Sequence, residues 1–169
     1  MNTIGCILGL IVATLTFNAC NSHQSPKGQS ESVPNETGGL PPLTVKLQAF
    51  NKKYLTINHQ DNTIAANSTN QKDGAWFEVV EIEGGRIALK GANNKYISVE
   101  RSEKGKVTAA REQAGDWENF QFIDIDKNHL ALKNSNGAYL APDSTCQWQL
   151  FGNHKNMDKE TYFAIELNR

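Results

Sequence analysis

Three aromatic side chains are the best candidates for binding a ligand. Trp148 is expected at a turn, where a tryptophan has little reason to be present for folding alone. Exposed aromatic faces stack on sugar rings and on other apolar ligand surfaces. Trp76 and Phe50 are lesser candidates of the same kind. The alternative for all three is packing, with Trp148 folded back over the end of the fold or covering Cys146.

Residues that could catalyse a reaction or hold a metal ion form no recognisable pattern. Asp116 and Glu118 could act as a carboxylate pair in glycoside hydrolysis, but their place beside Trp117, which itself fits a packing position, favours a solvated strand end. Cys146 is a lone thiol, expected to be a partly buried small residue rather than a reactive or intermolecular one. We expect no enzyme activity, no metal and no cofactor, because the histidines share no metal-ligand spacing (His23, His59, His129 and His154).

The chain is organised by a unit that recurs three times. Its shared pattern is aliphatic-x-Leu, an Asn four residues on, a Tyr three residues further and then an aliphatic residue. The tyrosines lie 42 and 43 residues apart, and a second series, of phenylalanines, lies 43 and 43 residues apart. Two independent aromatic series with one period indicate an internal repeat. The two series are Tyr54, Tyr96 and Tyr139, and Phe77, Phe120 and Phe163.

Each unit is predicted to contain four short strands. Val45, Leu47 and Ala49 alternate with polar residues, which is typical of a strand with one buried face. The Asn-x-x-Tyr segment predicts a hairpin turn, because asparagine tolerates left-handed backbone and can close a turn with its side chain. A second turn, a strand of small residues and a strand led by the repeated Phe complete the unit. The units span about residues 44–85, 86–128 and 129–168.

This repetition predicts an all-β fold, a single β-trefoil of twelve strands in three four-strand repeats at residues 44–168. A propeller of three blades would fall below the usual minimum of four. In Leu130 to Tyr139 and in Trp117-Glu118-Asn119-Phe120 the sequence resembles the fascin-like β-trefoil family, whose repeats carry a similar Asn-Gly-x-Tyr hairpin and a following Trp-Glu-x-Phe. Ricin-type trefoil lectins match less well, since their Gln-x-Trp signature does not occur in the sequence.

Positions that all three units share are assigned to folding, and positions that break the symmetry are the site candidates. Trp148 has Asn62 and Gly105 or Lys106 as counterparts, and the counterparts of Phe50 are Ala92 and Ser135. The shared leucines, tyrosines and phenylalanines are expected in the core, and the shared asparagines are expected to form turns. These positions are Leu47, Leu89 and Leu132, the two aromatic series, and Asn51, Asn93 and Asn136.

The N-terminal segment is predicted to direct export. Residues 4–17 are almost wholly apolar, about as long as the core of a signal peptide and too short to span a bilayer comfortably. Phe17-Asn18-Ala19-Cys20 resembles the lipobox of bacterial lipoproteins, and the alternative is an ordinary cleaved signal. We expect residues 1–19 to be a signal peptide of the lipoprotein type, Cys20 to be lipidated, and residues 20–43 to form a tether.

Composition and export together suggest the function. The net charge of −1 offers no electrostatic footprint for nucleic acid. The leading hypothesis is a monomeric, non-enzymatic binding module at the bacterial cell envelope, lipid-anchored to the outer membrane, with a polysaccharide as its ligand. The alternative is a protein-interaction or structural trefoil with an envelope protein as partner. The resemblance implies actin bundling in fascin itself, which uses several trefoils in the cytoplasm, and a lone exported copy is not expected to inherit that activity.

Overall fold

The computed structural model describes residues 41–168, so the predicted signal peptide, Cys20 and most of the predicted tether lie outside the described residues. Twelve strands and four single-turn 3₁₀ helices follow one another in this part of the chain. The 3₁₀ helices are η1 (Gln71–Asp73), η2 (Arg101–Glu103), η3 (Ser144–Cys146) and η4 (Lys159–Thr161). Among residues 41–168, no helix is long and apolar enough to cross a membrane.

Six strands close into an antiparallel barrel, in which each strand pairs with the next and the last pairs with the first. In order around the barrel they are β1 (Thr44–Ala49), β4 (Trp76–Ile82), β5 (Arg86–Gly91), β8 (Phe120–Asp124), β9 (His129–Asn134) and β12 (Tyr162–Asn168). Because β12 pairs with β1, the two ends of the described chain lie side by side. The first and third units therefore meet along a seam.

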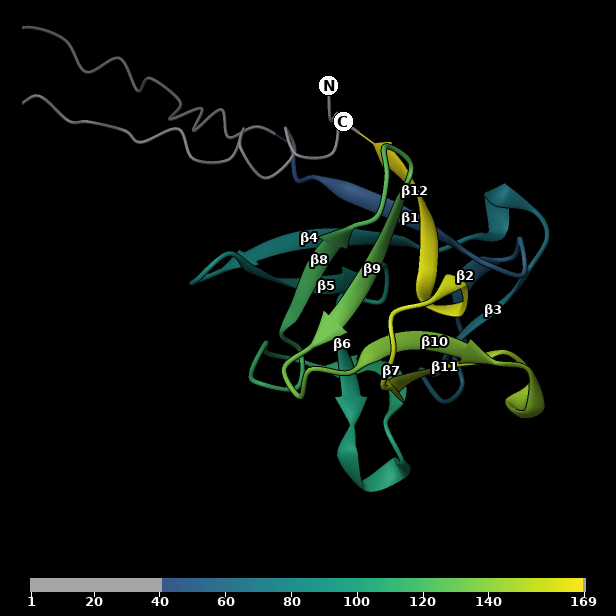
Figure 1. Cartoon of the computed structure of the whole chain (residues 1–169). Helices are drawn as coiled ribbons and strands as arrows, with labels where there is room; N and C mark the ends of the chain where they lie inside the picture. Colours follow the sequence, from purple (N-terminus) through teal and green to yellow (C-terminus); the bar gives the residue numbers. More distant parts are fainter. Residues whose placement is uncertain (1–40, 169) are drawn as a thin grey trace, which may run out of the picture.

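The other six strands form three hairpins that cap the barrel. They are β2 (Tyr54–Ile57) with β3 (Ile64–Ser68), β6 (Tyr96–Glu100) with β7 (Lys106–Arg111), and β10 (Tyr139–Asp143) with β11 (Gln149–His154). The hairpins also touch one another, since β11 pairs with both β3 and β7. In Figure 1 the barrel strands β8, β9 and β12 stand upright, and the β6–β7 and β10–β11 hairpins lie below them. A closed barrel with three capping hairpins is a β-trefoil, so the predicted fold is confirmed.

The core contains the repeated leucines and phenylalanines, as predicted, and each of these six side chains is at most 1% exposed. The repeated tyrosines are half-buried instead, so the prediction that they belong to the core was wrong. Tyr96 pairs across the sheet with Lys90, whose Nζ lies 5.6 Å from the centre of the ring. Because side chains alternate along a strand, Ile97 takes the inward position and the tyrosine covers the outer face.

A ring of three backbone hydrogen bonds joins the hairpins. Each hairpin has a residue with left-handed backbone near the start of the third strand of its unit. Gly105 (φ of 86°) and Trp148 (62°) directly precede that strand, and Asn62 (58°) lies two residues before it. The carbonyl of each accepts from the third strand of another unit: Asn62 from Ala109 at 2.8 Å, Gly105 from Gly152 at 2.7 Å and Trp148 from Ala66 at 2.8 Å. Every hairpin is therefore held by both of its neighbours.

Asparagine side chains close the first turn of each unit, but not all from the predicted positions. The Nδ2 groups of Asn51 and Asn93 donate to backbone carbonyls of the third strand of their own unit. In the third unit Asn134 does this, while the predicted Asn136 is exposed. Position 134 corresponds to Gly91, where a Cβ would lie only 2.9 Å from the Asn93 side-chain oxygen. An asparagine at position 134 can therefore bring its amide to the same place. Asn136 lies in the turn as predicted, but Asn134 rather than Asn136 closes it with its side chain.

Candidate functional site

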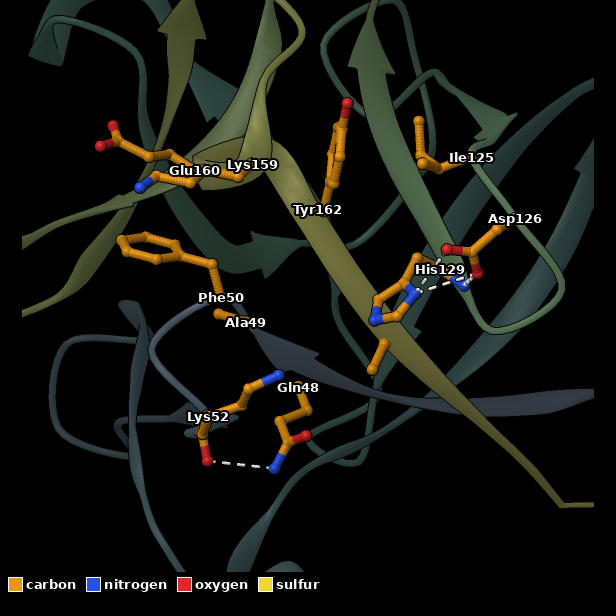
Figure 2. Close-up of a pocket in the computed structure, with 11 residues that line it drawn as sticks. Gln48, Ala49, Phe50, Lys52, Ile125, Asp126, His129, Lys159, Glu160 and Tyr162 are labelled. Carbon is orange, nitrogen blue, oxygen red and sulfur yellow. Dashed lines mark hydrogen bonds and ion pairs between the residues drawn. The ribbon is translucent and has the colours of Figure 1, made fainter.

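An open pocket of about 470 Å³ lies at the seam between the first and third units. Three segments line it: the end of β1 with its following turn, the turn between β8 and β9, and η4 with the start of β12. The barrel brings them together because β12 pairs with β1 on one side and with β9 on the other. Figure 2 shows the side chains of all three segments around the same space.

Two aromatic side chains line the pocket, and both are half-buried. Phe50 extends from the turn after β1, and Tyr162 is the first residue of β12. Phe50 is supported by Trp148, with ring centres 6.0 Å apart and ring planes at 64°. Edge-to-face packing of this kind holds an aromatic ring in a defined orientation. The pocket therefore has two aromatic surfaces, one of which is positioned by a third ring.

Trp148, the leading candidate from the sequence, is not the exposed tip residue that we expected. It is half-buried, packs against the hydrophobic core and does not line the pocket. Its backbone N–H donates to the carbonyl of Asp143 at 2.9 Å, which fixes the left-handed conformation of the turn. The structure thus corresponds to the packing alternative for Trp148, with the ring placed behind Phe50.

Trp76 also packs against protein and lies outside the lining of the pocket. The Nζ of Lys46 lies 4.4 Å from the centre of its ring, which is a cation–π arrangement. Lys46 is only 4% exposed, and its Nζ donates to the carbonyl of Gln71 at 2.6 Å. Trp76 precedes Phe77 as Tyr162 precedes Phe163, so the two residues occupy the same position in different units. Of the three sequence candidates, only Phe50 lines the pocket.

The polar groups of the pocket include a hydrogen-bonded histidine and aspartate and two lysines. His129 Nδ1 lies 3.0 Å from each carboxylate oxygen of Asp126. Hydrogen bonds from the Asn128 backbone and then from the His129 side chain hold the pKa of Asp126 below its usual value. On the other side of the pocket, Gln48 Nε2 donates to the carbonyl of Lys52 at 3.0 Å.

The carboxylates considered for catalysis lie elsewhere. Asp116 is exposed, as expected, but Glu118 is only 6% exposed, so the prediction of a solvated strand end was wrong for Glu118. Its Oε2 accepts from the backbone N–H of Gly115 at 2.8 Å, and Oε1 lies 4.0 Å from Arg111 Nε. Trp117 is half-buried, with the guanidinium carbons of Arg101 and Arg111 5.4 and 5.5 Å from its ring centre. These residues form a packed, hydrogen-bonded cluster.

Cys146 and one cluster of polar side chains also differ from expectation. Cys146 is exposed in η3, not partly buried, with its Sγ 3.8 Å from Thr145 Oγ1. His154, Asp158 and Glu160 bring one nitrogen or oxygen atom each within 4.8 Å of one another, which histidine spacing alone did not reveal. Asp158 is engaged by the protein, since one of its carboxylate oxygens bonds His154 Nε2 at 3.0 Å and the other accepts from the Glu160 backbone at 2.9 Å.

Tyr162, His129 and Asp126 were not among the residues singled out from the sequence. Tyr162 carried one usable signal, because it stands directly before a repeated Phe, as the candidate Trp76 does. His129 and Asp126 carried none. Asp126 lies in the turn between two units, His129 begins β9, and both reach the pocket only through the pairing of β9 with β12.

The barrel, the hairpin cap and the pocket at the seam define a β-trefoil with an open pocket where its first and last strands meet. Residues 51–165 match the Fascin domain family, and this match covers more than half of the chain. The chain therefore belongs to the Fascin domain family. No curated protein matches its sequence.

Several solved structures are similar. The designed threefold-symmetric protein ThreeFoil aligns over 72% of this chain and 96% of its own, with 16% identity and a TM-score of 0.62. The BEL β-trefoil aligns over 75% of this chain and 93% of its own, with 16% identity and a TM-score of 0.61. The GlcNAcα1-4Gal-releasing endo-β-galactosidase from Clostridium perfringens aligns over 75% of this chain but 33% of its own, with 12% identity and a TM-score of 0.62. At such low identity these likenesses establish the fold alone.

Proposed function

We propose that the domain binds a saccharide in the pocket at the seam. The observation that carries this proposal is the presence of Phe50 and Tyr162 in one open pocket with hydrogen-bonding side chains from three segments. The apolar face of a sugar ring can stack on an aromatic ring while its hydroxyl groups bond amides, ammonium groups and carboxylates. The likeness to part of a glycan-releasing enzyme is consistent with this ligand class.

The pocket is better suited to binding than to glycoside hydrolysis. A hydrolase needs one carboxylic acid that is protonated near neutral pH to act as the general acid. Asp126 accepts hydrogen bonds from the His129 ring and from two backbone N–H groups, which favour the ionised form. This carboxylate is therefore poorly suited to donate a proton, and we propose a binding module without catalytic activity.

The test is a glycan array probed with the folded domain, followed by calorimetry on the glycans that bind. We expect dissociation constants of about 1 mM to 1 μM, the range of a small site with few contacts. Phe50→Ala and Tyr162→Ala should each weaken binding about 10-fold or more. Trp76→Ala is the matched control, because this residue occupies the same position as Tyr162 in another unit but lies outside the pocket.

The outcomes separate the two functional hypotheses. Equal losses in Tyr162→Ala and Trp76→Ala, with both variants folded, would contradict the pocket as the binding site. A folded domain that binds no glycan on a broad array would refute the saccharide proposal and favour a protein-interaction or structural trefoil.

We further propose that the protein is exported and lipid-anchored at Cys20, in the envelope of a bacterial cell. The apolar segment and the Ala19-Cys20 pair support this. In cells fed labelled palmitate, the wild-type protein should incorporate label and sediment with membranes, and Cys20→Ser should do neither. A wild-type protein that takes up no lipid would contradict the anchor and leave the saccharide proposal unaffected.

A further inference from the structure

Two lysines flank the aromatic part of the pocket. Lys52 lies in the turn after β1 and Lys159 lies in η4, and both line the pocket. Figure 2 shows their side chains on either side of Phe50 in this view. Within residues 41–168, neither lysine takes part in an ion pair, whereas Lys95 and Lys106 do. The pocket therefore holds two ammonium groups that are available to a ligand.

The acidic side chains of the pocket are either engaged by the protein or directed away from the rings. The carboxylate oxygens of Asp126 lie 3.0 Å from His129 Nδ1, and one of them accepts from the backbone N–H groups of Asn128 and His129. Glu160 lies beside His154 and Asp158, and in Figure 2 its carboxylate points away from Tyr162 and His129. Lys52 and Lys159 are therefore the charged groups of the pocket that lie beside Phe50.

An ammonium group offers three hydrogen-bond donors and no acceptor, and it attracts an anion as a compact point charge. A sugar ring stacked on Phe50 or Tyr162 would carry its substituents toward one or both lysines. On the basis of the proposed saccharide site, we infer that the pocket selects acidic saccharides, in which a ring substituent is a carboxylate or a sulfate ester. The aromatic rings bind the sugar face, and Lys52 and Lys159 bind the anionic substituent.

The experiment compares saccharides that differ only in charge. Polygalacturonate is paired with its fully methyl-esterified form, and dextran sulfate is paired with dextran. The charged member of at least one pair should bind about 10-fold more tightly at low salt, since two exposed ion pairs each contribute up to about fivefold. This advantage should shrink at 0.5 M NaCl, where exposed charges are screened. Which pair responds distinguishes a carboxylate from a sulfate.

Matched variants distinguish the pocket from general attraction to a polyanion. Lys52→Met and Lys159→Met keep the aliphatic stem and should each weaken binding of the charged polymer about threefold to fivefold. Lys155→Met removes a positive charge from an exposed residue outside the pocket and should leave binding unchanged. Equal losses in all three variants would overturn the inference, because the attraction would then be non-specific.

Two other outcomes also overturn it, and they bear differently on the proposed function. Equal binding of charged and neutral members, lost in Phe50→Ala, would reject acidic selectivity and leave the saccharide site standing. If none of the four polymers binds, acidic selectivity is rejected as well. The glycan array then decides the saccharide proposal separately, since binding of neutral glycans there would sustain it.

Discussion

Replacing Asn134 by alanine should destabilise the domain far more than replacing Asn136. Asn134 is 6% exposed, and its Nδ2 donates to the Gly152 carbonyl at 2.7 Å. Its Oδ1 accepts from the backbone N–H groups of Asn136 at 3.0 Å and Ala138 at 3.2 Å. A buried carbonyl that loses its partner costs about 1–3 kcal/mol and each of the two turn hydrogen bonds about 0.5–1 kcal/mol, so we expect Asn134→Ala to lower the free energy of unfolding by about 2–5 kcal/mol.

The assay is urea unfolding followed by tryptophan fluorescence. With a denaturant slope of about 2 kcal/mol per molar, the midpoint of Asn134→Ala should fall by about 1–2.5 M. Asn136 is exposed, and within residues 41–168 only its backbone takes part in a hydrogen bond. Asn136→Ala should therefore change the free energy of unfolding by less than about 0.5 kcal/mol. Equal midpoints, or a larger loss in Asn136→Ala, would refute the assignment of the turn to Asn134.

Three further predictions concern stability. Phe120→Ala should lower the free energy of unfolding by about 3–5 kcal/mol, and Tyr96→Ala by only about 1–2 kcal/mol because Tyr96 is half-buried; calorimetric unfolding measures both. Burial raises the pKa of Glu100, but the hydrogen bonds from Arg111 and Thr108 and the positive charge of Arg111 together outweigh it and hold the pKa below 4.5. This carboxylate therefore stabilises the fold above that pH and loses its contribution as pH falls through the lowered pKa, so stability measured in acid should fall less steeply in Glu100→Gln. The urea midpoint of Trp148→Gly should be equal to or higher than that of Trp148→Ala, although glycine has one carbon fewer. The reason is that alanine is strained at a φ of 62° and glycine is not.

The fold could be predicted because a few residues recur along the chain with the period of its threefold symmetry. The phenylalanines recur every 43 residues because each starts, or lies next to the start of, the last strand of its unit, with its side chain in the shared core. The same symmetry misled the side-chain assignments in two places. Tyr96 and its counterparts recur because they cover the outer face of a hairpin, and Asn136 keeps the sequence pattern while Asn134 makes the bonds.

The pocket could be predicted only in part. Phe50 was found because its counterparts are small or polar, which is a property of the sequence alone. Tyr162 and His129 lie far from Phe50 along the chain, and only the closure of the barrel by β12 brings them together. Trp148 was misjudged because its turn position suggested exposure, whereas the left-handed backbone places its ring against the core and Phe50.

The ring of hydrogen bonds among the hairpins has no first and no last member. Linear repeat proteins can lose a terminal unit and keep the remaining ones folded. Here the loss of any unit would leave a donor and an acceptor unpaired in the other two, so the domain cannot be shortened by a unit. The pocket lies at the seam that closes last along the chain, since η4 and β12 form part of its wall. During synthesis the proposed ligand-binding surface would therefore form only when the final strand has been made, and a truncated chain would lack it.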